Sequence, residues 1–165
     1  MNKLPQITLA FWVMKICATT LGETAGDLLS MTLDIGYALS SLLLISLFVV
    51  SLFGQLRARS YQPALYWTVI LTTSTAGTTI SDFMDRSLGL GYASGALVLI
   101  SLLVGVLAAW RLSEKSLSVD HINSRRGELF YWGAILVSNT LGTALGDYLA
   151  DDSGLGFAGG ALLIG

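Results

Sequence analysis

The organisation of this chain is set by residues 63–110, which read PALYWTVILTTSTAGTTISDFMDRSLGLGYASGALVLISLLVGVLAAW. Two apolar stretches flank a short turn at Gly89 and Gly91, and each is near the ~20 residues that cross a bilayer as a helix. The first stretch contains Asp82 near its end, whereas the second contains no ionisable residue. This pattern predicts a helical hairpin, made of an acid-bearing helix, a short turn and a plain apolar helix.

The same pattern occurs three times in the chain. Placing Trp12, Trp67 and Trp132 in one column, with offsets of 55 and then 65 residues, aligns both helices and the turn without a gap. The other aligned sets are Thr20/Thr75/Thr140, Gly22/Gly77/Gly142, Asp27/Asp82/Asp147, Gly36/Gly91/Gly156, Ala38/Ala93/Ala158 and Leu42/Leu97/Leu162. Such self-similarity indicates a tandem repeat. We therefore predict a single polytopic membrane domain over 1–165 with repeats at 8–56, 63–110 and 129–165, the third of them incomplete.

The composition places these repeats in a membrane. Hydrophobic residues make up 53% of the chain, charged residues 12%, and the mean hydropathy is +0.69, whereas soluble domains have about a quarter charged residues. Five stretches are long enough to span the hydrocarbon core, at 8–29, 36–56, 63–84, 90–110 and 129–149. A sixth begins at Gly156 and stops within an apolar helix, which indicates that the natural protein continues. We expect an all-α integral membrane protein with about six transmembrane helices in this chain.

The net charge and the few reactive side chains exclude several functions. A net charge of −2 provides no basic field for binding nucleic acid. A single cysteine excludes an internal disulfide framework, and one cysteine with one histidine excludes the usual zinc and haem sites. No nucleophile has a neighbouring base, so the sequence does not predict an enzyme.

The loops divide into a basic set and an acidic set. Two helices per repeat return the chain to its starting side, so the repeats are parallel and related by an axis along the membrane normal. The N-terminus and the loops at 57–62 and 111–128 contain seven of the nine basic residues, namely Lys3, Arg57, Arg59, Arg111, Lys115, Arg125 and Arg126. The opposite turns contain Asp34, Asp85, Asp151 and Asp152 with Arg86. By the positive-inside rule the N-terminus is cytoplasmic, and the aromatic pairs Phe11-Trp12, Tyr66-Trp67 and Tyr131-Trp132 mark the inner interface.

Five ionisable residues lie within the predicted spans: Lys15, Glu23, Asp27, Asp82 and Asp147. On a helix that turns about 100° per residue, those of the first span share one face about 140° wide with Thr20. A charge at the centre of a spanning helix costs on the order of 3 kcal/mol, so such residues face the bundle interior or water and find partners. The three equivalent aspartates are expected to converge around the pseudosymmetry axis.

The first repeat departs from the other two at its charged positions. Lys15 aligns with Ile70 and Ile135, and Glu23 aligns with Thr78 and Thr143. We therefore interpret the first helix as the working element on a symmetric scaffold.

The leading hypothesis is a transporter with an acidic, oxygen-lined pathway for a cation. The pathway residues are Lys15, Glu23, Asp27, Asp82, Asp147, Thr20, Thr75, Asn139 and Thr140. The four acids among them are the metal-ligand candidates, and Lys15 is an internal counter-charge. Such oxygens suit hard ions such as Mn²⁺ or Mg²⁺, or protons that drive another solute. No cofactor is expected besides a bound divalent cation; the partners are the lipid bilayer and that small ion, with homo-oligomerisation left open.

Each of these interpretations has a structural alternative. The aspartates lie close to the outer turns and could cap their helices or bond to the next turn. Glu23 could form a structural ion pair or be protonated within the bundle, and Lys15 could reach the inner interface. Under this alternative the protein is a non-transporting membrane scaffold or assembly protein, whose buried acids hold the helices together.

Glycines lie beside the acidic face at helical spacing. Gly22 and Gly26, Gly142 and Gly146, and Gly77 with Ser81 form small-xxx-small patterns, which let helices approach closely in a membrane. We predict a packing role for these glycines.

Motifs in two of the repeats give the chain its resemblance to a known family. They are Lys15, Gly22-Glu23-Thr24 and Asp27 in the first repeat, and Trp132, Asn139-Thr140-Leu141-Gly142-Thr143 and Asp147 in the third. It resembles a bacterial family of predicted membrane-anchored proteins built from a repeat of unknown function. The resemblance covers nearly the whole chain, and the motif maps onto Gly22, Glu23, Asp27, Gly77, Asp82, Gly142 and Asp147. It implies four repeats, eight helices, a bacterial inner membrane and a suspected transport role in metal-resistant bacteria, without a substrate.

Overall fold

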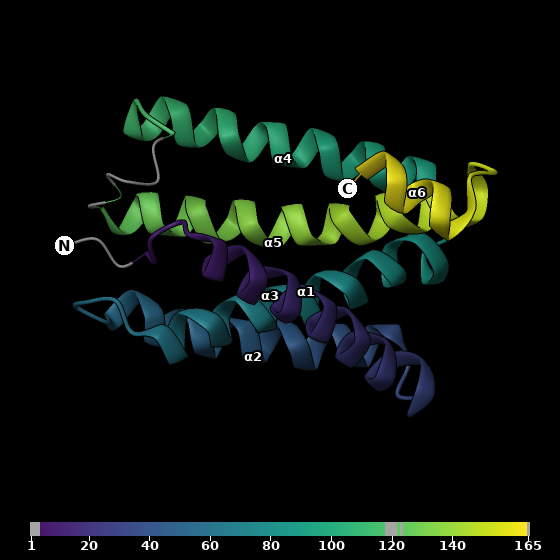
Figure 1. Cartoon of the computed structure of the whole chain (residues 1–165), viewed down its shortest axis with the longest axis horizontal. Coiled ribbons are helices and arrows are strands. Elements are labelled where there is room, and N and C mark those ends of the chain that lie inside the picture. Colours follow the sequence, from purple (N-terminus) through teal and green to yellow (C-terminus); the bar gives the residue numbers. More distant parts are fainter. Residues whose placement is uncertain (1–3, 118–121, 123, 165) are drawn as a thin grey trace.

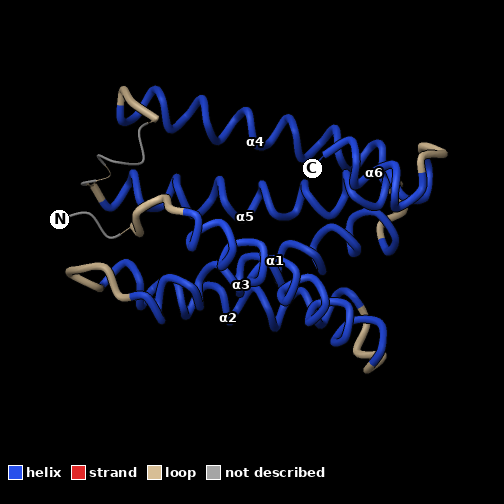
Figure 2. Tube along the Cα trace, viewed as in Figure 1, coloured by secondary structure: helices blue, strands red, loops and turns tan. Residues whose placement is uncertain are grey.

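The computed structural model describes residues 4–117, 122 and 124–164, so Lys3 and the last residue of the third repeat lie outside the described residues. Regular structure within these ranges is entirely helical (Figures 1 and 2). The α-helices are α1 (Leu9–Asp27), α2 (Tyr37–Arg57), α3 (Pro63–Asp82), α4 (Tyr92–Glu114), α5 (Arg125–Asp147) and α6 (Gly156–Ile164). The predicted all-α architecture is confirmed.

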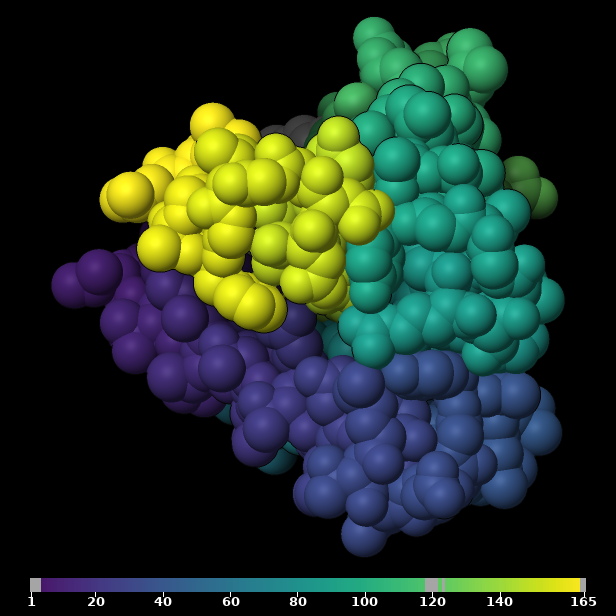
Figure 3. Space-filling model, turned by 90° about the vertical axis from the view of Figure 1, so that its right-hand side faces the viewer, coloured from purple at the N-terminus to yellow at the C-terminus, as the bar shows by residue number. Residues whose placement is uncertain are grey.

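The acid-bearing helices α1, α3 and α5 run in the same direction, and α2 and α4, which follow α1 and α3 in the chain, run the opposite way on the outside of the bundle (Figure 1). The connections α2–α3 and α4–α5 lie at one end of the bundle, which we call the loop end. The turns that follow α1, α3 and α5 lie at the opposite end, which we call the turn end and which Figure 3 views directly. This arrangement agrees with parallel repeats, because each repeat begins and ends at the loop end.

Each apolar helix packs against the acid-bearing helix of the next repeat. α2 packs along α3, α4 packs along α5, and α3 also contacts α1 and α5. The two helices of a single repeat therefore do not form the closed hairpin that the sequence predicts. Helix α3 is the centre of the bundle, and its side chains from Thr72 to Thr79 are all buried.

Every acid-bearing helix widens into a π-helical turn directly after its aspartate. The turns are η1 (Leu28–Thr32), η2 (Phe83–Ser87) and η4 (Tyr148–Asp152). Each is closed by an equivalent backbone hydrogen bond over five residues, of 2.8 Å at Leu33, 2.9 Å at Leu88 and 2.9 Å at Ser153. Single π-helical turns are rare in proteins, and many of those that do occur are at functional sites. The sequence analysis predicted only a short turn at these positions.

Helices α4 and α5 extend beyond their predicted spans into the loop between them. Helix α4 continues to Glu114, and α5 begins at Arg125. The Ser124 hydroxyl explains this start, because it accepts a hydrogen bond from the Gly127 N–H at 2.8 Å and donates one to Glu114 Oε1 at 2.8 Å. A capping side chain of this kind satisfies the free N–H groups at a helix start.

The contact between α1 and α3 recurs between α3 and α5 in the same register. Ser74 lies against Gly22 and donates its hydroxyl to the Thr19 carbonyl at 3.0 Å. At the equivalent place, Asn139 lies against Gly77.

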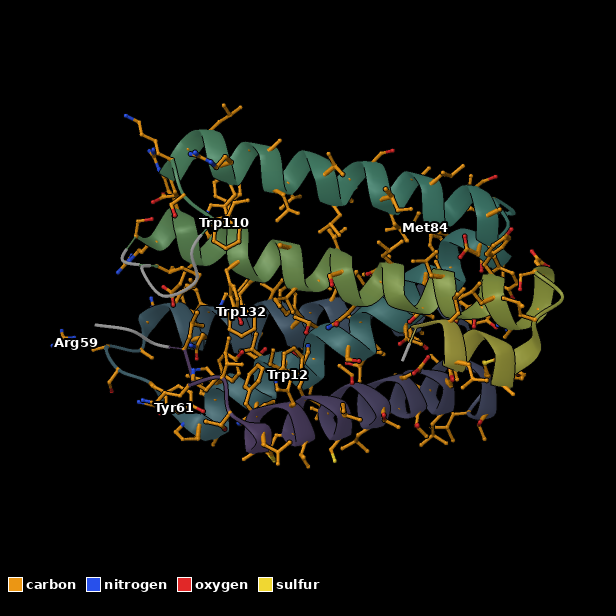
Figure 4. All side chains as sticks on the ribbon, turned by 45° about the horizontal axis from the view of Figure 1, so that its top comes forward. Trp12, Arg59, Tyr61, Met84, Trp110 and Trp132 are labelled. Atoms are coloured by element: carbon orange, nitrogen blue, oxygen red, sulfur yellow. The ribbon has the colours of Figure 1, made fainter. Side chains whose placement is uncertain are left out.

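The aromatic layer at the loop end repeats in the same way. The Phe11 and Trp67 rings lie 5.7 Å apart, and the equivalent rings of Tyr66 and Trp132 lie 5.5 Å apart. Figure 4 shows Trp12, Trp110 and Trp132 toward the end of the bundle that contains Arg59, with Met84 toward the other end. The sequence repeat is thus also a repeat of tertiary contacts.

The structure separates the predicted packing glycines into two groups. Gly22, Gly26 and Gly77 lie at close helix contacts, where an added Cβ would come within 3.3 Å of the neighbouring helix. Gly142 and Gly146 depart from the predicted role, because an added Cβ at either would meet nothing within 4 Å among the described residues. Helices α1 and α3 each pack against a following acid-bearing helix, and α5 is the last such helix described.

Gly77→Ala and Gly142→Ala test this difference at equivalent positions. A Cβ at Gly77 would lie 2.9 Å from the Thr140 backbone nitrogen, which cannot move without shifting α5. We expect Gly77→Ala to lower the free energy of unfolding by about 1–3 kcal/mol. Gly142→Ala should cause no loss, because alanine favours the helix and nothing obstructs it. Thermal unfolding of both variants measures the difference, and equal losses would contradict the contact.

Asp34→Gly tests the geometry of the turn end. Asp34 has φ +54°, and the equivalent residues are Gly89 at +71° and Gly154 at +77°. This left-handed conformation costs a residue with a side chain roughly 1–2 kcal/mol, although aspartate tolerates it better than most. Asp34→Gly should therefore raise the melting temperature, and Gly89→Ala, which meets no neighbouring atom, should lower it. A lower melting temperature for Asp34→Gly would contradict the conformational explanation.

Candidate functional site

Polar side chains of α3 and α5 meet in layers along the length of the bundle. Near the loop end, the hydroxyls of Tyr66 and Tyr131 lie 2.9 Å apart. Farther along, the hydroxyls of Thr78 and Thr143 lie 3.4 Å apart. Each pair joins equivalent positions of successive repeats, which means that these positions face a common axis.

The aspartate column forms the layer next to the turn end, and Arg86 lies within it. Arg86 Nε is 3.3 Å from Asp82 Oδ1, and a terminal guanidinium nitrogen is 3.7 Å from Asp147 Oδ2. The Asp82 side chain is 3% exposed and that of Asp147 is 25% exposed. The guanidinium therefore joins the acids of two repeats across the contact between α3 and α5.

The acids of the first repeat approach the same layer from α1. The charges of Glu23 and Asp27 both act on the Asp147 carboxylate, and Arg86 acts on Asp27. Glu23 itself is exposed and Asp27 is half-buried. Asp82 and Asp147 therefore meet at Arg86, and convergence of the acids of α1 with them stays a prediction.

Two tyrosines at equivalent positions surround Arg86. The guanidinium donates a hydrogen bond to the Tyr37 hydroxyl at 3.2 Å, and it lies 5.9 Å from the Tyr37 ring and 5.8 Å from the Tyr92 ring. Burial opposes its charge, but the Asp82 carboxylate and the Tyr37 hydroxyl outweigh burial and raise the pKa of Arg86. Arg86 is therefore a permanent cation beside the acids.

Arg86 was not among the site residues predicted from the sequence, where it stood only as a basic residue in an acidic turn. Two signals could have found it. It lies four residues after Asp82, the spacing at which opposite charges meet on a helix. It also replaces Met31 and Asp151 of the other repeats, the same kind of departure that singled out Lys15.

The sequence predicts Lys15 as the counter-charge of the acids, but in the structure Lys15 is not paired with them. It lies one to two turns into α1 at the loop end, eight residues before Glu23, or about 12 Å along the helix. Its Nζ atom is buried and has no hydrogen-bond partner in the described part of the chain. The counter-charge beside Asp82 and Asp147 is Arg86, which forms an ion pair with each.

The predicted pathway hydroxyls are mostly engaged with their own helices. Thr75 and Thr140 are buried and donate to carbonyls of the preceding turn, and Asn139 donates to the Thr73 hydroxyl at 3.0 Å. Thr20 is exposed on α1. The Thr75 and Thr140 hydroxyls have used their protons but keep oxygen lone pairs, so they can accept from or coordinate a neighbour without donating to it.

The four acids do not form a ready-made metal site. Among the residues that the structure describes, no three His, Cys, Asp or Glu side chains are gathered closely enough to hold a metal ion. Arg86 occupies the space between Asp82 and Asp147 that a cation ligated by both would need. Of the predicted metal ligands on α1, Glu23 is exposed and Asp27 is half-buried.

Comparison with known proteins identifies the repeat. Searches of curated proteins and of solved structures found no match to this chain. Residues 10–61, 65–116 and 130–165 each match the family described as Repeat of Unknown Function (DUF347). Since the three matches cover most of the chain and coincide with the repeats of its tertiary contacts, the protein belongs to the DUF347 repeat family.

Proposed function

We propose that this protein is integral to a membrane, with its loop end in the cytoplasm of a bacterial cell. Helices α2 and α4 are long and apolar enough to cross a bilayer, with mean hydropathies of 2.1 and 2.2. Large apolar side chains are exposed along both, including Leu42, Val50, Leu97 and Val104. Contiguous apolar surface of this kind needs a lipid or protein partner.

The charges of the two ends support this orientation. Every described basic residue except Arg86 is toward the loop end, and all of these apart from Lys15 of α1 are in or beside the connections that follow α2 and α4. Basic residues favour the cytoplasmic side, and aromatic residues favour the interface. The aromatic layer of Phe11, Trp67, Tyr66 and Trp132 at the loop end fits the inner interface.

We infer that the protein moves a cation along the axis between α1, α3 and α5. The observation that supports this most strongly is the series of equivalent polar pairs on that axis, ending in the acids around Arg86. Ionisable groups within a membrane bundle are costly and are typical of ion or proton pathways. The cargo that suits these carboxylates is a hard divalent ion such as Mn²⁺ or Mg²⁺, or a proton coupled to another solute.

Arg86 provides a mechanism for this transport. A cation or proton arriving at Asp82 or Asp147 competes with the guanidinium for the same carboxylate oxygens. About a third of the Arg86 side chain is exposed, so the guanidinium can move away from the axis. Tyr37 and Tyr92, which both lie beside it, are placed to hold it after that movement. Return of Arg86 to the aspartates would then release the cargo.

A second function is favoured by the same ion pair. The Asp82–Arg86–Asp147 contact joins α3 to α5 and could serve only to hold the helices of a membrane scaffold together. Removing one member of a buried ion pair leaves the other charge unpaired and is strongly destabilising. Flux and stability therefore distinguish the two functions.

Asp147→Asn separates transport from scaffolding. The purified chain in proteoliposomes should take up Mn²⁺ or dissipate a pH gradient, each followed with an enclosed dye. We expect Asp147→Asn to reduce the active flux by at least tenfold, because the amide cannot replace the carboxylate charge at the axis. The matched control is Asp152→Asn, an exposed acid at the same end of the bundle, which should retain full flux.

Thermal unfolding of the same samples completes this test. Asp147 is partly exposed, so its variant should remain folded even where its flux is lost. Absence of flux from the unmodified protein, or full flux from a folded Asp147→Asn variant, would contradict the transport proposal. A lower melting temperature without any ion response would instead support the scaffold.

A further inference from the structure

A pocket of about 460 Å³ opens at the loop end, far from the acids. Helices α1, α3 and α5 contribute to its walls, and residues 4–7 border it before α1 begins. Its volume is within the ~300–1,000 Å³ that is usual for small-molecule sites. The Tyr66–Tyr131 pair of the polar axis also lines this pocket, but the pocket is far from the acids where the cargo would bind, so its ligand can be inferred separately.

Among the described residues that line the pocket, Lys15 provides the only charged side chain. Its Nζ atom is buried and has no hydrogen-bond partner in the described ranges, although an ammonium has three protons to donate. Buried ammonium groups are costly unless they are paired and hydrogen-bonded. Because none of the described lining residues carries a carboxylate, the missing partner of Lys15 is best supplied by a bound anion.

The tyrosine pair in the pocket provides a second donor. Tyr66 and Tyr131 share one hydrogen bond of 2.9 Å, in which one hydroxyl donates and the other accepts. The proton of the accepting hydroxyl remains available for a third group. An ammonium and a phenol therefore both line the pocket and can each donate to an anionic oxygen, as a carboxylate requires.

Apart from Gln6 at the edge before α1, the remaining walls of the pocket are apolar and aromatic. They include Leu4, Ile7, Phe11, Trp12 and Ile135. Such walls bind the hydrocarbon part of a ligand but give no hydrogen bonds to a fully polar ion. An anion with an apolar body therefore fits the pocket better than a free inorganic anion does.

We propose that this pocket binds a small amphipathic carboxylate from the loop side. Its carboxylate would pair with Lys15 and the free tyrosine hydroxyl, and its apolar or aromatic body would lie against Phe11, Trp12 and Ile135. The positions equivalent to Lys15 in the other two repeats are isoleucines, so only one of the three repeats has a lysine at this position. The proposal rests on the pocket alone and stands or falls independently of cation transport.

Binding of 4-phenylbutyrate tests this site, with its uncharged amide as the matched probe. Calorimetry on the full chain in a neutral detergent should show the carboxylate binding at least tenfold more tightly than the amide. Lys15→Met should weaken the carboxylate at least tenfold, which is the usual loss for a charge-assisted hydrogen bond. Lys15→Arg should retain most of the affinity. Lys115→Met, at an exposed lysine of the same end, should bind like the unmodified protein.

Two further measurements keep the proposal testable if a variant is unstable. Tyr131→Phe removes one pocket hydroxyl and should weaken the carboxylate severalfold without affecting the amide. A ring-brominated phenylbutyrate should quench the fluorescence of Trp12, and Trp12→Phe should abolish that part of the quenching. Equal affinity for acid and amide, or unchanged affinity after Lys15→Met, would overturn the proposal. So would displacement of the probe by phosphatidylglycerol at comparable concentration, which would assign the pocket to a lipid headgroup.

Discussion

Close contact between small residues of successive acid-bearing helices sets the register of this bundle. Ser74 against Gly22, and Asn139 against Gly77, bring α1 to α3 and α3 to α5 at equivalent heights. A side chain at either glycine would push the helices apart, because its nearest neighbours include backbone atoms. Small residues have this effect in membranes, where helices associate through packing and hydrogen bonds instead of the hydrophobic effect.

This register explains why equivalent side chains meet one another. With the helices parallel and level, Tyr66 reaches Tyr131 and Thr78 reaches Thr143. The aspartates then gather in one layer, where like charges would repel without a cation. Arg86 provides that charge from the π-helical turn after α3, so the polar axis depends on both the repeat and one departure from it.

The sequence predicts the helices, their parallel direction and the close contacts at Gly22, Gly26 and Gly77, because these follow from composition and from the spacing of the repeat, but it wrongly predicts such contacts at Gly142 and Gly146. It does not predict that α2 packs along α3, because an evenly apolar helix has no face that selects a partner. Nor does it predict the π-helical turns, since their hydrogen bonds depend on backbone geometry. Lys15 and Arg86 were both visible as departures from the repeat, but only the fold shows which of them reaches the aspartates.

Disulfide cross-linking of Thr78→Cys with Thr143→Cys tests most directly whether equivalent residues share one axis. The two hydroxyls are 3.4 Å apart, which is suitable for a disulfide, and Cys17 would be replaced by serine. We predict rapid cross-linking between these cysteines under mild oxidation. A control pair at Thr24 and Thr68, roughly 16 Å apart along α1 and α3, should stay reduced. Failure of the Thr78–Thr143 pair to cross-link in folded protein would contradict the shared axis and the pathway built on it.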